Sequence, residues 1–232
     1  MTHLQPVLRV KHSKKQVAEE IAEHFNFKFS RYVDAAVTDA VVYTTQPRSP
    51  KRSVLNTVDQ TTELILTVLQ ESPDELVTAA QHLWEDLSKE EYESIAASDP
   101  SPDPVEAAAH YLYLNQLTQP GTRTYDANHK AEKFPWDDIR LWSERLDGVK
   151  ILSNQPFEMF DQARASDLVF LDTSSGIDLE PALEVAHDSP GQAAILTTGD
   201  TAVQPPDSFR QLVLSKCRPG SRTPDVLYLK SE

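Results

Sequence analysis

The chain has 232 residues, a net charge of −14 and 39% hydrophobic residues, which predicts a folded protein with one large domain or a domain that carries an insertion. The acidic charge argues against non-specific binding to nucleic acid or to acidic membranes. The single cysteine, Cys217, excludes an internal disulfide and a cysteine-rich zinc site, and the lack of an 18-residue apolar run excludes a membrane-spanning helix.

The N-terminal part of the chain predicts one helix followed by two buried strands. Apolar residues recur at helical spacing between Val17 and Phe25, after Ser13. The short apolar runs 32–37 and 53–56 are typical of buried strands.

The segment 61–146 predicts a block of helices. Two capping boxes, at Ser72 and Ser88, each place a glutamate three residues after the serine and so indicate helix starts. The proline-rich segment 99–104 interrupts the block, and Pro104 suits the first turn of the next helix.

From residue 149 onward the pattern alternates between strands and helices. The expected strands are 149–153, 167–172, 193–198 and 226–230, and the expected helices are 156–164, 179–187 and 207–216. Such alternation predicts a mostly parallel sheet covered by helices.

Four polar residues lie at or near the ends of expected strands: Asp34, Asn56, Asn154 and Asp172. Ligands of parallel sheets bind at the carboxyl ends of the strands, near the point where the strand order reverses, so these residues are the candidates for a site. The alternative is that they only cap helices or form turns.

Five segments follow one another in the chain: Val7–Lys14, Tyr32–Ala36, Val54–Asp59, Tyr111–Asn115 and Asp167–Asp172. In this order they resemble the successive motifs of the Dam-like DNA adenine N6-methyltransferases, and the similarity covers about residues 7–200. The resemblance implies an α/β, Rossmann-like, S-adenosylmethionine-dependent methyltransferase fold with a helical insertion. Residues 1–60 and 147–232 would form the Rossmann-like domain, and residues 61–146 an insertion resembling a DNA target-recognition subdomain.

The cofactor-binding positions of that family are mostly altered. Of the motif that helps to hold S-adenosylmethionine, only Lys14 is kept. Asp34 keeps the acidic position of the next motif, but the glycines after it are replaced by bulkier residues that restrict the backbone. The acids expected to contact the ribose and the adenine align with Thr57 and Asn154, so both charges are lost.

The catalytic tetrapeptide of the family, Asp-Pro-Pro-Tyr, aligns with Asp172, Thr173, Ser174 and Ser175. Asp172 keeps the carboxylate that accepts from the flipped adenine, but the aromatic ring that stacks on the base is missing. Loss of this ring would cost about 1–3 kcal/mol of stacking.

These changes favour a catalytically degenerate relative, a pseudoenzyme that acts as a binding or structural scaffold and needs no cofactor. One alternative is a divergent but active enzyme that binds S-adenosylmethionine. A second is a non-catalytic DNA-binding protein that uses basic residues outside the acidic segment 61–106; the candidates are Arg9, Lys11, Lys15, Arg123 and Lys130.

The sequence also carries expectations about metals, partners and location. No pair of histidines has a metal-ligand spacing, so we expect no metal. A protein partner or self-assembly is expected, without membrane binding. The acidic composition is typical both of proteins of salt-loving archaea and their viruses and of ordinary acidic cytosolic proteins. Without a secretory signal, we expect the protein in the cytoplasm or in a virion.

Overall fold

The computed structural model describes residues 4–11, 13–25, 28–46, 52–120, 122, 124–126, 134–199, 203–217 and 223–230. The chain divides into two compact units, each described here by itself. The sheet unit comprises His12–Asp59 and Gly148–Glu232, and the helical unit comprises Met1–Lys11 and Gln60–Asp147. Residues 4–11 therefore group with the helices, whereas the resemblance assigns residues 1–60 to the Rossmann-like domain. Arg123 and Lys130 lie outside the described residues.

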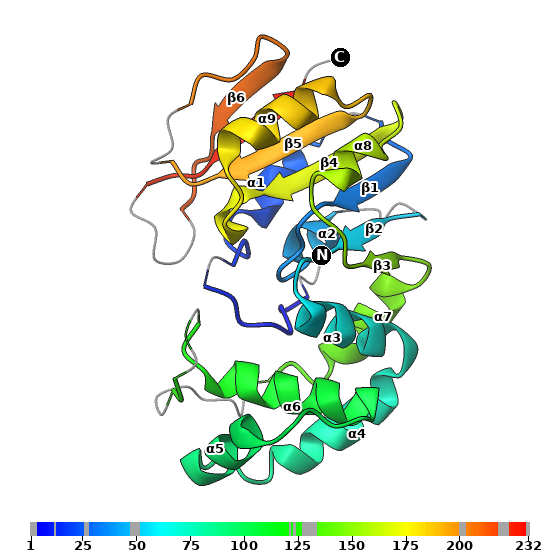
Figure 1. Cartoon of the computed structure of the whole chain (residues 1–232), viewed down its shortest axis with the longest axis vertical. Helices are drawn as coiled ribbons and strands as arrows, with labels where there is room; N and C mark the ends of the chain where they lie inside the picture. Colours follow the sequence, from blue (N-terminus) through cyan, green and yellow to red (C-terminus); the bar gives the residue numbers. More distant parts are fainter. Residues whose placement is uncertain are drawn as a thin grey trace. The chain divides into compact units, whose positions relative to one another are not determined.

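Among its described residues, the sheet unit contains seven strands and several helices (Figure 1). The strands are β1 Arg31–Asp34, β2 Val54–Asn56, β3 Lys150–Leu152, β4 Asp167–Asp172, β5 Gln192–Thr197, β6 Phe209–Val213 and β7 Val226–Lys230. The helices are α1 Ala18–Glu23, α2 Val41–Thr45, α8 Glu158–Asp161, α9 Leu179–Asp188 and the 3₁₀ turn η2 Thr173–Ser175. The helix expected over 156–164 is reduced to the four residues of α8.

The strands follow the order β3-β2-β1-β4-β5-β7-β6. β1 pairs with both β2 and β4 in parallel, so the strand order reverses beside β1. β7 is antiparallel to both of its neighbours, β5 and β6. The expected helix over 207–216 is wrong, because residues 209–213 form β6 and pair with β7 along the whole strand.

Side chains alternate between the two faces of the sheet, as the two-residue period of a strand requires. Val33 of β1 and Val169 of β4 belong to the core cluster that also contains residues of α8 and α9. On the neighbouring positions, Tyr32 and Phe170 stack with ring centroids 6.5 Å apart, and Tyr32 also contacts Tyr43 of α2. In Figure 1, α8 and α9 cover one face of the sheet and α1 the other.

The helical unit contains the helices α3 Gln60–Glu71, α4 Pro73–Leu83, α5 Lys89–Ala97, α6 Pro104–Leu117 and α7 Asp138–Leu146. Ser88 caps α5 by accepting from the backbone N–H of Glu91 at 3.1 Å, as expected. Pro104 occupies the first turn of α6 after the cap residue Asp103. Ser72 lies between the end of α3 and the start of α4, and its side chain forms no capping hydrogen bond. Its backbone (φ −140°, ψ 54°) is not in the extended conformation that a capping residue adopts. None of the helices among the described residues is long and apolar enough to cross a membrane.

Polar side chains of α6 and α7 hold the N-terminal segment on the helical unit. Asn115 exchanges two hydrogen bonds with the backbone of Arg9, accepting at 2.8 Å and donating at 3.0 Å. Gln116 donates to the carbonyl of Val7 at 2.8 Å, and the Trp142 indole donates to the carbonyl of Gln5 at 2.8 Å. Backbone groups that would otherwise need a strand partner are satisfied in this way.

Candidate functional site

The carboxyl ends of β1, β2 and β4 bring three of the predicted site residues to one edge of the sheet. Asp34, Asn56 and Asp172 are the last residues of these strands, and Asn154 follows β3 by two residues. All three strand-terminal side chains are buried, with Asn56 fully inaccessible. This edge lies beside the reversal of strand order, where ligands of such sheets bind.

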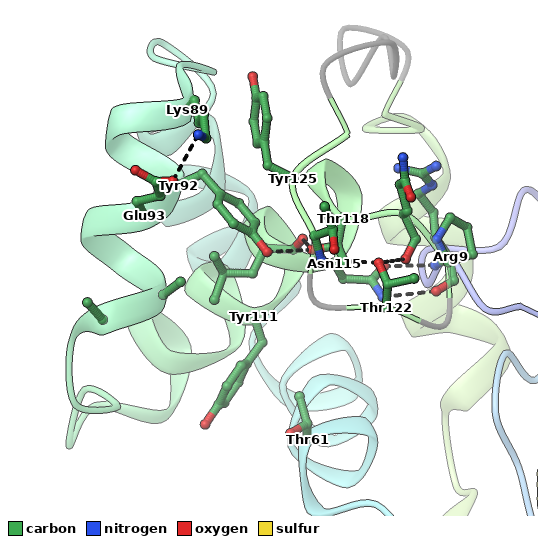
Figure 2. Close-up of a pocket in the computed structure, with 16 residues that line it drawn as sticks. Arg9, Thr61, Lys89, Tyr92, Glu93, Tyr111, Asn115, Thr118, Thr122 and Tyr125 are labelled. Atoms are coloured by element: carbon green, nitrogen blue, oxygen red, sulfur yellow. Dashed lines mark hydrogen bonds and ion pairs between the residues drawn. The ribbon is translucent and has the colours of Figure 1, made fainter.

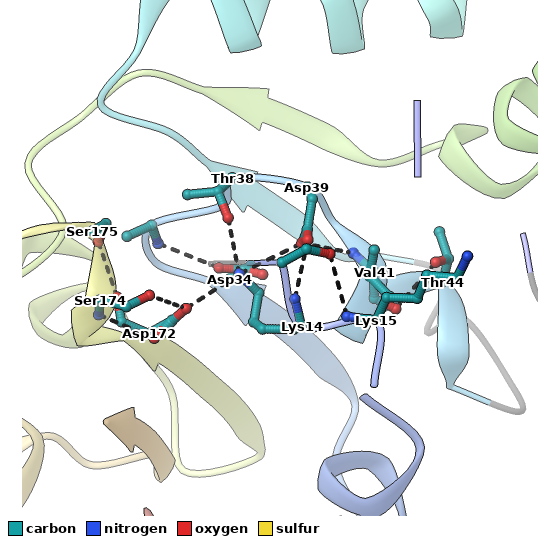
Figure 3. Close-up of polar contacts among 12 residues, drawn as sticks. Lys14, Lys15, Asp34, Thr38, Asp39, Val41, Thr44, Asp172, Ser174 and Ser175 are labelled. Carbon is teal, nitrogen blue, oxygen red and sulfur yellow. Dashed lines mark hydrogen bonds and ion pairs between the residues drawn. The ribbon is translucent and has the colours of Figure 1, made fainter. Parts of the chain in front are cut away.

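A buried lysine occupies the centre of this edge (Figure 3). The Lys14 ammonium lies 3.2 Å from Oδ2 of Asp172 and 3.5 Å from Oδ1 of Asp39, and it donates to the Thr38 hydroxyl at 2.8 Å. All three charged side chains are at most 3% exposed. Sequence reasoning treated Thr38 and Asp39 only as replacements for glycines, but they are partners of Lys14. We refer to Lys14, Thr38, Asp39 and Asp172 as the lysine cluster.

The residues after Asp172 turn back onto its carboxylate. The Ser174 hydroxyl donates to Oδ2 of Asp172 at 2.7 Å, and the Ser174 backbone N–H donates to Oδ1 at 3.1 Å. The Ser175 hydroxyl donates to the Asp172 carbonyl at 2.9 Å, and Thr173 bonds to Thr197 at 3.0 Å. With Lys14, these donors satisfy both oxygens of the Asp172 carboxylate from within the chain.

The amides near the ends of β2 and β3 hold neighbouring loops together. The Asn56 side chain donates to the carbonyl of Ala35 at 2.8 Å and accepts from the N–H of Asn154 at 2.9 Å. The Thr57 hydroxyl accepts from the N–H of Asp59 at 3.1 Å, which makes a local turn. Of the positions aligned with the ribose and adenine contacts, Thr57 thus uses its hydroxyl in a local turn, and Asn154 is held through its backbone.

The loop after β1 has no glycine, yet Ala40 adopts a left-handed conformation with φ 49°. Alanine is disfavoured there because its Cβ crowds the backbone. Val37 is buried, and its N–H donates to the Asn56 carbonyl at 2.7 Å. The loop is thus tied to β2.

Asp34 is a buried acid next to the lysine cluster. Its carboxylate accepts from the Ala36 N–H at 3.3 Å and lies 3.5 Å from the Tyr32 hydroxyl. Burial raises the pKa of this carboxyl from 3.8 to about 7, although the charge of Lys14 acts in the opposite direction.

The raised pKa predicts a stability that depends on pH. Between about pH 4 and pH 7 the folded protein keeps a proton that the unfolded chain has lost, so the contribution of Asp34 to the free energy of unfolding falls as pH rises and levels off above pH ~7. We expect Asp34→Asn to remove this part of the pH dependence. Urea unfolding of both proteins from about pH 5 to about pH 8 measures it, and parallel profiles would refute the assignment.

The described residues proposed to bind nucleic acid fall in different settings. Arg9 is bound within the helical unit, with its guanidinium 3.3 Å from Asp126. Lys11 and Lys15 are exposed. No group of three or more histidine, cysteine or acidic residues suited to a metal occurs among the described residues.

Two hollows lie near the motif positions. In the helical unit, a hollow of about 1150 Å³ is lined by Tyr92, Tyr111, Tyr125, Arg9 and other residues (Figure 2). Asn115, the last residue of the family-like segment Tyr111–Asn115, also lines it, but its amide is engaged with Arg9. In the sheet unit, a smaller hollow of about 260 Å³ lies against Phe157 after β3 and Ile177 after η2.

Two features of the sheet decide the fold. The order of the strands reverses beside β1, and β7 lies between β5 and β6 and is antiparallel to both. This is a Rossmann-like methyltransferase fold. The chain is similar to a solved methyltransferase from Geobacter sulfurreducens, with 10% identity, coverage of 93% of this chain and 78% of that chain, and a TM-score of 0.45. It is also similar to a conserved hypothetical protein from Streptococcus pyogenes, with 10% identity, coverage of 93% and 96%, and a TM-score of 0.46. No family model matches the sequence, and no curated protein matches it. Because both TM-scores are below 0.5, the fold assignment rests on the strand order.

Proposed function

We propose that this protein is a catalytically inactive relative of the Dam-like DNA adenine methyltransferases that serves as a scaffold, binding a protein partner or assembling with itself. One observation carries the proposal: the Asp172 carboxylate is paired with the buried ammonium of Lys14 and accepts from Ser174. In the family that the sequence resembles, the aligned carboxylate accepts a hydrogen bond from the amino group of the flipped adenine.

To bind Asp172, the neutral amino group of a substrate adenine would have to replace the charged Lys14 ammonium as the hydrogen-bond donor. Charge-assisted hydrogen bonds are about twice as strong as neutral ones, and a displaced Lys14 would stay buried with only Asp39, at 3.5 Å, as a carboxylate partner. Removing one partner from a buried ion pair costs about 3–5 kcal/mol. The short polar side chains of Ser174 and Ser175 supply no ring to offset this cost by stacking.

The positions aligned with cofactor contacts do not suit S-adenosylmethionine. Ribose hydroxyls and the adenine amino group are recognised by acidic acceptors in that family, but the two aligned positions here are Thr57, whose hydroxyl closes a local turn, and Asn154, which carries no charge and whose backbone is held by Asn56. Asp34 is buried, and burial favours its neutral form.

A methyl-transfer assay tests the proposal. Wild-type protein and Asp172→Ala are incubated in high salt with S-adenosylmethionine labelled in its methyl group and with adenine-containing duplex DNA. The account predicts the same background incorporation for both proteins. Incorporation by the wild type that Asp172→Ala abolishes would instead support the divergent but active adenine N6-methyltransferase.

The hollow of the helical unit favours a second candidate, non-catalytic DNA binding. It combines the rings of Tyr92, Tyr111 and Tyr125 with the cations Arg9 and Lys89, a combination suited to bases and phosphates. Both cations are, however, next to a carboxylate, Lys89 at 3.2 Å from Glu93 and Arg9 at 3.3 Å from Asp126, which reduces their attraction for phosphate.

DNA binding is tested by fluorescence anisotropy with labelled duplex and single-stranded DNA over a range of salt concentrations. If the exposed Lys11 contacts phosphate, Lys11→Gln weakens binding and lowers the salt slope by about one, whereas Arg140→Gln on α7 leaves both unchanged. Equal effects of the two variants would attribute any binding to net charge alone.

A further inference from the structure

Arginines gather at the amino ends of the strands, the edge of the sheet opposite to the lysine cluster. A hollow of about 240 Å³ there is lined by Ser30, Arg31, Arg52, Arg164, Ser166 and Asp167. Ser30 immediately precedes β1, Ser166 immediately precedes β4, and Arg52 lies two residues before β2. Segments distant in the sequence thus contribute to one small hollow, because parallel strands begin at the same edge of a sheet.

Hydrogen bonds hold the walls of this hollow in place. The Ser30 N–H donates to the Ser166 carbonyl, and the two serine hydroxyls are 2.8 Å apart. The buried Asp167 carboxylate accepts from Nε of Arg31 at 3.0 Å and from the backbone N–H of Arg164 at 2.8 Å. Asp167 therefore orients Arg31 and the loop that carries Arg164 before any ligand arrives.

The hollow carries more positive than negative charge. Three guanidinium groups surround one carboxylate, in a protein with a net charge of −14. Arg52 and Arg164 are exposed, and within the described part of the chain their guanidinium groups have no polar partner. Such a concentration of like charge favours a bound anion.

We propose that this hollow binds a phosphate group, carried either by free phosphate or by the end of a nucleic acid. Guanidinium forks match the geometry of phosphate oxygens, and the Ser166 hydroxyl, which accepts from the Ser30 hydroxyl, keeps its own hydrogen as a further donor. A hollow of about 240 Å³ suits a compact tetrahedral anion. The site is independent of the methyltransferase-type edge and of the scaffold role proposed above.

The test is a calorimetric titration of the full chain with inorganic phosphate, and with short single-stranded oligonucleotides that carry a 5′-phosphate or a 5′-hydroxyl. The double variant Arg52→Gln/Arg164→Gln removes the two unpartnered guanidinium groups. Because both side chains are exposed, we expect the variant to fold, which circular dichroism checks. Arg210→Gln, at an exposed arginine on β6, is a control for loss of positive charge away from the hollow.

We expect the double variant to weaken phosphate binding about tenfold or more, because it loses two charge-assisted interactions, and the control to leave binding unchanged. A preference for the 5′-phosphorylated oligonucleotide over both other ligands identifies a nucleic-acid end, and equal binding of inorganic phosphate identifies the free anion. No binding of either phosphate ligand by the wild type would overturn the proposal, as would equal losses in the double variant and in Arg210→Gln.

Discussion

Replacing Lys14 with methionine is expected to lower the free energy of unfolding of the sheet unit by about 3–5 kcal/mol. The substitution keeps much of the side-chain volume but leaves the carboxylates of Asp39 and Asp172 buried without their ammonium partner. Carboxylates at this depth cannot recover their hydration, so the folded state bears the desolvation cost. Urea unfolding followed by far-ultraviolet circular dichroism measures the loss.

The adjacent lysine provides the control. Lys15 is exposed, so Lys15→Met removes the same charge without emptying the lysine cluster, and we expect a change within about 0.5 kcal/mol. Adding Asp172→Asn to Lys14→Met removes one of the two buried carboxylate charges that have lost their ammonium partner, and we expect it to recover part of the lost stability. A Lys14→Met protein as stable as Lys15→Met would show that the cluster does not hold this edge of the sheet together.

Replacing Trp142 with alanine is expected to destabilise the helical unit by about 3–5 kcal/mol. Trp142 lies on α7 and is fully buried, and its indole N–H donates to the carbonyl of Gln5. The variant leaves a cavity and removes one of the hydrogen bonds that fix the N-terminal segment. We therefore also expect faster amide hydrogen exchange in residues 4–11.

The neighbouring Leu141 is the matched control for this second variant. It is 42% exposed on the same helix, and Leu141→Ala should cost less than about 1 kcal/mol. Denaturant unfolding compares the two variants, and hydrogen exchange locates the change. A Trp142→Ala protein that loses no more stability than Leu141→Ala, with unchanged exchange in residues 4–11, would contradict the packing described for the helical unit.

Local sequence patterns predicted those elements whose residues carry a strong signal of their own. The bounds of β4 agree with the expected 167–172, because a continuous apolar run ends in an aspartate on each side. The start of α5 follows from the local chemistry of Ser88 and Glu91. The start of α6 follows from Asp103 and Pro104.

The errors occurred where long-range pairing decides the structure. Residues 209–213 form β6 because β7 offers a hydrogen-bonding edge, and local periodicity carries no information about that partner. Simple alternation of strands and helices therefore gave the wrong element there. Residues 5–9 likewise join the helical unit through side chains more than a hundred positions away, such as Asn115 and Gln116.

The candidate site shows the same division. The sequence resemblance singled out Lys14, Asp34 and Asp172 as the charged residues kept from the family motifs. In the fold, Asp34 and Asp172 end neighbouring strands, and Lys14, in the segment before α1, reaches Asp172. The sequence did not reveal that Lys14 pairs with Asp172, 158 positions away, or that Asp39 and Thr38 complete the cluster. A buried lysine requires a partner, but only the fold shows which carboxylates supply it.

The most direct test of the account is calorimetric titration of the purified protein, in high salt, with S-adenosylmethionine and with its demethylated product. Because the polar groups at the carboxyl edge of the sheet are engaged inside the chain, the account predicts no binding heat up to about millimolar ligand. Binding of either compound at about micromolar concentration would contradict it, because the edge would then have to open its lysine cluster to admit a cofactor.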